Sequence, residues 1–174
     1  GSIECWGYDE NDQVSDAPTD SGYTAVSAGG YHNCAIKASG GIECWGRNNE
    51  GQLSDAPTGT GYTAVSSGFY HSCALGSTGA IECWARNNEG QVSGTPTGSG
   101  YTAVSTGEWH NCALGSSGGI VCWGRDDYDQ VSGAPTGSGY TAVSGGLAHT
   151  CALDSAGSIE CWGMDDYGQC SDIP

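Results

Sequence analysis

Basic residues are scarce in this sequence. Only four of its 174 residues are lysine or arginine, against 20 aspartates and glutamates, so the formal net charge is −16. Phosphate backbones and anionic membrane surfaces repel such a chain, which excludes nucleic acid and membranes as expected partners. The composition resembles that of proteins from salt-loving microbes, since molar salt shortens the Debye length to about 3 Å. Ordinary solubility of an acidic secreted protein is the alternative.

Long apolar runs are also missing. No stretch approaches the roughly 18 residues that a membrane span needs, so no membrane insertion is expected. There is one phenylalanine, Phe69, whereas 31 residues are glycine, which excludes a conventional thick core. Thin packed layers or cross-links must hold the chain together. It starts at Gly1 within a repeat, which indicates a mature or excised piece of a longer protein.

Cysteine, by contrast, is abundant, with ten residues. So many cysteines in a short chain indicate a disulfide framework, which persists in an oxidising compartment. The close cysteine or histidine pairs of a structural zinc site are absent. We therefore expect a secreted or cell-surface protein.

Four short sequence motifs recur every 39 residues. Tyr-Thr-Ala-Val-Ser and His-x-Cys-Ala occur four times, and Ile-x-Cys-Trp and a Gln-x-Ser motif occur five times. Such a period identifies a repeat architecture. The chain is therefore divided, as one domain over residues 1–174, into a half unit (1–22) and the units 23–61, 62–100, 101–139 and 140–174.

Each motif has the pattern of a short β-strand. Residues 23–27, 34–36 and 42–45 alternate and are rich in β-forming side chains, and the turn residues 38–41 join the last two as a hairpin. Residues 52–54 are expected to form a weaker outer strand. Four strands in about 40 residues are the dimensions of a propeller blade. We predict an all-β fold, a β-propeller of short four-stranded blades.

The hairpin brings cysteines ten residues apart to opposite positions on its two strands. The predicted disulfides are Cys34–Cys44, Cys73–Cys83, Cys112–Cys122 and Cys151–Cys161. Cys5 and Cys170 are left at opposite ends of the chain. A bond between them within one chain, closing the ring, is favoured over a bond between chains.

These residues carry a family likeness. His-x-Cys-Ala-Leu, then Gly-x-Ile-x-Cys-Trp-Gly, then Asn-x-x-Gly-Gln-Leu resemble the repeat of the regulator-of-chromosome-condensation (RCC1) type, in its cysteine-bearing, secreted prokaryotic version. The resemblance covers nearly the whole chain and implies a β-propeller. This chain has about four and a half short units where the family typically closes with seven. It also lacks a basic surface for chromatin, so only the architecture is carried over.

The histidines of the His-x-Cys-Ala motif occupy equivalent positions, which a closed ring could aim at one axis as zinc ligands. Because each precedes a strand, a structural hydrogen bond to the backbone is the preferred interpretation. The residues concerned are His32, His71, His110 and His149.

Two groups of residues are candidate ligand sites. Polar loops after each tryptophan, beginning at Asn48, Asn87, Asp126 and Asp165, offer oxygen ligands for weak calcium binding, although solvated Asx turns are the simpler interpretation. Aromatic residues precede three of the histidines, at Tyr31, Tyr70 and Trp109. Beside the polar loops, they could stack on sugars as in a lectin.

Catalysis has little support, because no copy of the repeat brings unlike reactive groups together. We therefore predict a non-catalytic structural or protein-interaction module without a cofactor. It could be a subunit of an extracellular assembly that self-associates through its terminal strands. A lectin-like carbohydrate-binding propeller is the alternative.

Overall fold

The computed structural model describes residues 1–172 and consists of strands and turns. The first two units supply β1 (Tyr23–Ala28), β2 (His32–Lys37), β3 (Ile42–Gly46), β4 (Tyr62–Ser67), β5 (His71–Gly76) and β6 (Ile81–Ala85). The last two supply β7 (Tyr101–Thr106), β8 (His110–Gly115), β9 (Ile120–Gly124), β10 (Tyr140–Gly145), β11 (His149–Asp154) and β12 (Ile159–Gly163). Residues 173 and 174 of the fourth unit lie outside the described part. Within residues 1–172, no helix is long and apolar enough to cross a membrane.

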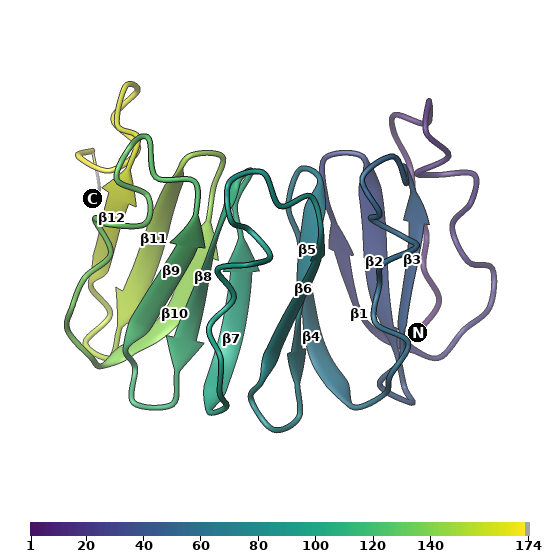
Figure 1. The fold of residues 1–174 in the computed structure, drawn as a ribbon, viewed down its shortest axis with the longest axis horizontal. Coiled ribbons are helices and arrows are strands. Elements are labelled where there is room, and N and C mark those ends of the chain that lie inside the picture. The colour runs from purple at the N-terminus through teal and green to yellow at the C-terminus, as the bar shows by residue number, and fades with distance from the viewer. Residues whose placement is uncertain (173–174) are drawn as a thin grey trace.

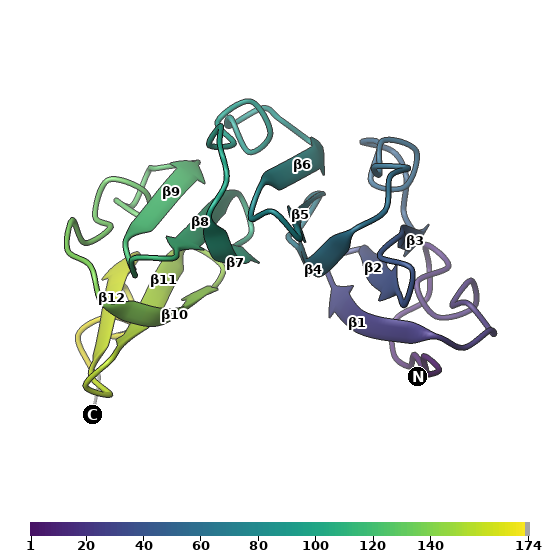
Figure 2. The same cartoon turned by 90° about the horizontal axis from the view of Figure 1, so that it is seen from below.

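Each unit folds into one three-stranded antiparallel sheet, in the orders β1-β2-β3, β4-β5-β6, β7-β8-β9 and β10-β11-β12. The four sheets stand side by side (Figure 1). Seen along the sheets they form an open arc, with the two termini at its opposite ends (Figure 2). β1, β4, β7 and β10 line the concave side of this arc, and β3, β6, β9 and β12 lie outermost. The all-β propeller architecture is thus confirmed.

The predicted fourth strand is wrong. Residues 52–54 lie in a turn rather than in a strand. The amides of Leu53 and Ser54 donate to Asn48 Oδ1 at 2.9 and 3.1 Å, and the amide of Glu50 donates to Gln52 Oε1 at 2.9 Å. Because Leu53 and Ser54 direct their backbone amides to a side chain within the loop, these amides do not extend the sheet beyond β3.

The core lies between adjacent sheets rather than within one large interior. At the first junction, Cys34 and Ile42 of one sheet pack against Ala74, Trp84 and Val65 of the next. The same set of positions recurs at the other two junctions. Trp84 keeps its indole Nε1 satisfied, because the group donates to Gln52 O at 2.9 Å. These junctions match the thin layers expected from the composition.

The four predicted hairpin disulfides are confirmed. They join Cys34–Cys44, Cys73–Cys83, Cys112–Cys122 and Cys151–Cys161, and each pair occupies directly opposed positions on its two strands. In the turn of the first hairpin, Gly40 has φ +80°, and a Cβ there would lie 2.5 Å from Gly61 N. This turn therefore requires glycine. Cys5 and Cys170 are free thiols, so the favoured intramolecular clasp is not formed.

Candidate functional site

A strip of aromatic and arginine side chains runs along one rim. The strands are antiparallel, so the loops after β1, β4 and β7 lie at the same rim as the ends of β3, β6 and β9 (Figure 1). This placement brings Tyr31, Tyr70 and Trp109, which were predicted as a group, into one row. The centroids of the Tyr31 and Tyr70 rings are 5.6 Å apart with an interplanar angle of 14°, and those of Tyr70 and Trp109 are 5.5 Å apart.

Arginines occupy the spaces between these rings. Arg47 lies 5.4 Å from the Tyr31 centroid and 4.9 Å from that of Tyr70, while Arg86 lies 5.6 Å from Tyr70 and 4.5 Å from Trp109. Each guanidinium thus makes cation–π contacts with two neighbouring units. Contacts with neighbouring rings and with these cations use part of the ring surface, which leaves less of it open for a sugar to stack on. Its clearest role is to join adjacent sheets.

Sequence reasoning missed the two arginines. Their signal was present, because Arg47, Arg86 and Arg125 occupy one repeat position, directly after the residue that follows the tryptophan. In a chain with only four basic residues, this regular spacing was informative. Arg125 has no aromatic partner of this kind and instead pairs with Asp127 at 2.5 Å.

The polar loops are closed on themselves. The first side chain of each loop accepts hydrogen bonds from the backbone amides five and six residues later. The acceptors are Asn48, Asn87, Asp126 and Asp165, together with Asp9 in the half unit. These amides hold the pKa of the Asp165 carboxyl below its usual range. Residues 1–172 contain no cluster of three or more His, Cys, Asp or Glu suited to a metal ion.

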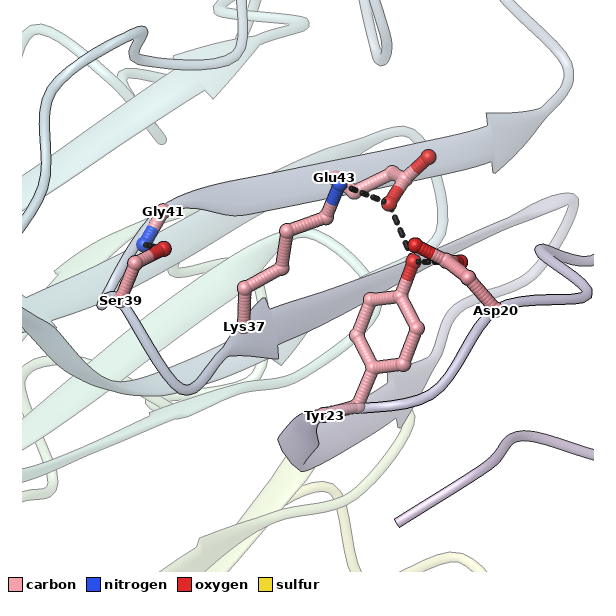
Figure 3. Close-up of polar contacts among 6 residues, drawn as sticks. All are labelled: Asp20, Tyr23, Lys37, Ser39, Gly41 and Glu43. Atoms are coloured by element: carbon pink, nitrogen blue, oxygen red, sulfur yellow. Dashed lines mark hydrogen bonds and ion pairs between the residues drawn. The ribbon is translucent and has the colours of Figure 1, made fainter.

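Tyrosine–glutamate pairs tie the start of the first strand to the third strand of the same sheet. In the first sheet, Tyr23 donates its hydroxyl to Glu43 and to Asp20 (2.8 Å for the latter), and Lys37 approaches Glu43 at 2.8 Å (Figure 3). Burial and these carboxylates raise the pKa of Tyr23, and the lysine and tyrosine lower the pKa of Glu43. The pair recurs in the second and fourth sheets. In the third sheet, Val121 replaces the glutamate.

The histidines connect one sheet to the next. Three of them are fully buried, and their Nε2 atoms contact a side chain one position beyond the histidine of the following unit. The contacts are His32–Ser72 (2.7 Å), His71–Asn111 (2.8 Å) and His110–Thr150 (2.8 Å). The expected hydrogen bond to the backbone is therefore wrong, because the partner is a side chain. The position after the histidine always holds a hydroxyl or an amide, and this pattern could have revealed it.

Burial sets the ionisation of these imidazoles. Desolvation lowers the pKa of His32, His71 and His110 to about 4, so they are neutral near pH 7. At His71, Nε2 donates to the amide oxygen of Asn111, and the buried Nδ1 has no partner. Each ring is packed closely, since a Cβ on Gly107 would lie 2.2 Å from His110 Cε1. These side chains hold sheets together and are not placed to bind a ligand.

The first end of the arc is an incomplete junction, which we call the N-face. Residues 1–22 pack on the first sheet as the matching part of a preceding unit would. Gly1 O accepts from Tyr23 N at 3.0 Å, as Gly40 O accepts from Tyr62 N at 3.0 Å in the next junction. Residues 1–22 contain no counterpart of the other two strands of such a unit. A groove of about 720 Å³ takes their place, lined by residues that include Ile3, Cys5, Val26, Ala28 and Asn33.

The opposite end, which we call the C-face, presents the complementary half of a junction. It consists of the outward sides of β10, β11 and β12. His149, Leu153 and Ile159 lie there, with Leu153 38% and Ile159 50% exposed. Ile36 and Leu75, the counterparts of Leu153, are buried, and those of Ile159 are only partly exposed. The two faces carry the apolar and polar groups that the three internal junctions use.

Comparison with known proteins fits this architecture. The model of the regulator of chromosome condensation (RCC1) repeat matches residues 23–52, 62–91, 101–130 and 140–169. The chain belongs to the RCC1 repeat family. No curated protein matches it.

Solved structures of similar fold include two plant receptor-kinase ectodomains. That of CR4 from Physcomitrella patens has a TM-score of 0.77 and 24% identity, over 93% of this chain and 47% of the other. That of ACR4 from Arabidopsis thaliana has a TM-score of 0.74 and 27% identity, over 92% and 56%. Prp20p from Saccharomyces cerevisiae has a TM-score of 0.71 and 20% identity, over 94% and 51%. This chain of RCC1 repeats therefore spans about half the length of each of these chains.

Proposed function

We propose that this chain is an extracellular, non-catalytic structural module that binds protein partners through its two end faces, as a subunit of a larger assembly. The observation that carries the proposal is the set of junction groups on the N-face and the C-face, which fit a neighbouring protein segment in the way that the internal junctions fit one another. Val26 is 57% exposed, and Cys151 is partly exposed where its counterparts Cys34, Cys73 and Cys112 are fully buried. Contiguous exposed groups of this kind mark a surface on which another protein segment packs.

The cysteines support an extracellular location. Four disulfides in one short chain are typical of proteins that fold in an oxidising compartment. The likeness to receptor-kinase ectodomains, one of them 27% identical, points the same way. Secretion from a prokaryote, which the cysteine-bearing form of the repeat suggests, is part of this proposal.

The roles of the repeated polar groups support a non-catalytic module. Histidine is the commonest general base, yet three of the four histidines are buried in junctions with their pKa lowered to about 4. Ser66 and Ser105 use their hydroxyls to accept backbone amides of the next sheet at 3.0 and 2.9 Å. These three histidines and two serines are thus used to hold the sheets together.

Carbohydrate binding at the rim strip is a second candidate, favoured by the row of three aromatic rings. It requires Arg47 or Arg86 to leave the ring faces that they cover. A glycan array would test it, with Tyr70→Ala as the matched variant. Binding that this variant loses would support a lectin, and no binding to any glycan would contradict it.

The main proposal is tested by photo-crosslinking on the surface of the secreting cell. A photoreactive amino acid is placed at Val26 in the N-face, at Ile159 in the C-face, or at Val121 as a control. Val121 is a control of similar chemistry, because it is 44% exposed and belongs to an internal sheet. We expect protein adducts from the two end faces and few from the control. Equal yields at all three positions would overturn the proposal.

A further inference from the structure

We propose that the rim strip is a docking site for a protein partner, and that Arg47 within it binds a glutamate side chain of that partner. The rim strip consists of Tyr31, Arg47, Tyr70, Arg86 and Trp109. It is separate from the N-face and the C-face, so the inference goes beyond the proposed function and does not depend on it. Three observations carry it: an unpaired guanidinium, the substitution that leaves it unpaired, and the residue types around it.

Arg47 has no carboxylate partner within residues 1–172. The other three lysine and arginine residues each lie beside an acid in this part of the chain. The pairs are Lys37–Glu43 (2.8 Å), Arg86–Glu50 (3.7 Å) and Arg125–Asp127 (2.5 Å). Among the described residues, the Arg47 side chain makes a single hydrogen bond, from Nη1 to the Tyr70 hydroxyl at 3.5 Å. An unpaired guanidinium is unexpected in a chain with 20 acidic residues and only four lysines and arginines.

The repeat explains why Arg47 is unpaired. Glu50 lies in the polar loop of the first unit and approaches Arg86 of the second unit. The position 39 residues before Glu50 holds Asn11. The two loops are built alike, because the amides of Asn11 and Glu50 each donate to the side chain of the glutamine two residues later, at 2.8 and 2.9 Å. An uncharged side chain therefore stands where the next junction supplies a carboxylate.

The carboxylates close to Asn11 have other partners. Asp9 accepts from two backbone amides of its own loop at 2.7 and 3.0 Å. Glu10 accepts from a tyrosine hydroxyl at 2.5 Å, and Asp12 from a serine hydroxyl at 3.5 Å. These three side chains do not pair with Arg47, so its guanidinium is available to a carboxylate from a partner.

The guanidinium is already positioned for such a ligand. Arg47 lies 5.4 Å from the Tyr31 centroid and 4.9 Å from that of Tyr70, and all three side chains are partly exposed. Its Nε is buried without a partner, whereas Nη2 is neither hydrogen-bonded nor enclosed. Guanidinium donors form a rigid fork that fits a carboxylate. Because the two rings hold this fork in place, binding orders few additional side-chain bonds.

The surroundings favour a protein as the partner. Tyrosine, tryptophan and arginine contribute most to binding at protein interfaces, and the rim strip consists of these three residue types. The contact between Arg86 and Glu50 shows that a glutamate side chain fits beside an arginine of this strip. The net charge of −16 repels a run of acidic residues. The partner segment is therefore expected to carry one glutamate among neutral or apolar residues.

The test uses an array of short synthetic peptides. They are supplied in pairs that differ only in a central glutamate or glutamine and that have varied neutral residues on both sides. The purified, labelled chain should bind the glutamate member of a pair about fivefold more tightly, which is the upper range for an ion pair that stays in contact with water. Equal binding of the two members, or no binding to any peptide, would overturn the proposal.

Three variants locate the effect. Asn11→Glu supplies Arg47 with an internal carboxylate, as Glu50 does for its arginine, and should abolish the preference for glutamate. Its fold should be unchanged in urea unfolding, since glutamate fills this position in two other units. Arg47→Gln should also abolish the preference. Arg125→Gln is the matched control at the same repeat position outside the rim strip and should keep it. A preference that survives Asn11→Glu would contradict the site.

Hexuronate oligosaccharides on the same array present a carboxylate on a sugar. Binding to these and not to the peptides would overturn protein docking at the rim strip and would favour the carbohydrate candidate. The end faces are tested separately, by crosslinking at Val26 and Ile159. Either idea can therefore fail while the other stands.

Discussion

The buried histidines should make the fold sensitive to mild acid. His32, His71 and His110 have pKa values lowered from 6.5 to about 4 by burial. The unfolded chain therefore binds three more protons than the folded chain at a pH between these values. Because protons then favour the unfolded state, stability is full above pH 6.5 and falls as the pH drops toward 4.

The size of this effect follows from the shift. A pKa lowered from 6.5 to about 4 corresponds to about 3 kcal/mol for each histidine, or about 10 kcal/mol for the three together. Between pH 7 and pH 5 the expected loss is about 5 kcal/mol, because this range covers only about 1.5 of the 2.5 pH units that separate the unfolded and folded pKa values. Ordinary carboxylates titrate mainly below about pH 4.5 and contribute little in this range.

The assay is urea unfolding followed by tryptophan fluorescence at a series of pH values, with the disulfides intact. His71→Gln should remove about a third of the pH dependence. His149→Gln is the matched control, since His149 is partly exposed and is not enclosed by a following sheet. An unfolding free energy that stays constant from pH 7 to pH 5, or a slope unchanged by His71→Gln, would refute the reasoning.

Four further changes test the packing by the same urea unfolding at pH 7. Ala85→Gly should stabilise by about 1 kcal/mol, because this alanine has φ +77° at a position where the other copies have glycine; a loss of stability would contradict the strain. Ser72→Ala should cost about 1–3 kcal/mol by leaving a buried imidazole unpaired, whereas Ser72→Thr should cost less, because threonine fills this position in the fourth unit. Val121→Glu should stabilise by about 0.5–1 kcal/mol by giving the tyrosine of β7 the carboxylate that its three counterparts have; no gain would show that the pair contributes nothing. Replacing both Cys73 and Cys83 by alanine should lower the unfolding free energy by about 3 kcal/mol, and a change near zero would mean that the hairpin does not depend on its disulfide.

The repeat and its strand alternation were sufficient to predict much of the fold. The 39-residue period gave the four sheets, and the ten-residue spacing of cysteines gave four disulfides, since both depend on local geometry. The strand expected at residues 52–54 failed because Asn48 draws the backbone amides into a closed loop, which apolar patterning does not register. Three-dimensional information was also needed for the arginines, because their partners lie in neighbouring units.

The same limit applies to the site. Tyr31, Tyr70 and Trp109 were predicted as a group, and they lie together in one row. Their sequence position did not reveal that Arg47 and Arg86 cover the ring faces. The end faces were anticipated only as leftover strands. Their complementarity became visible once the internal junctions showed which groups meet.

Each kind of side-chain bond between sheets recurs at its own fixed separation along the chain. His32 contacts Ser72 and Ser66 contacts Thr106, each 40 residues away, and the tryptophan–loop bonds span 32. Within residues 1–172, no sheet has a bond of this kind to a sheet more than one unit away. A gene that gains or loses a whole unit therefore keeps every remaining contact in register, whereas the insertion of one residue within a unit displaces the junctions on both sides. Whole units can therefore be added or lost at smaller cost to the remaining contacts than single residues within a strand.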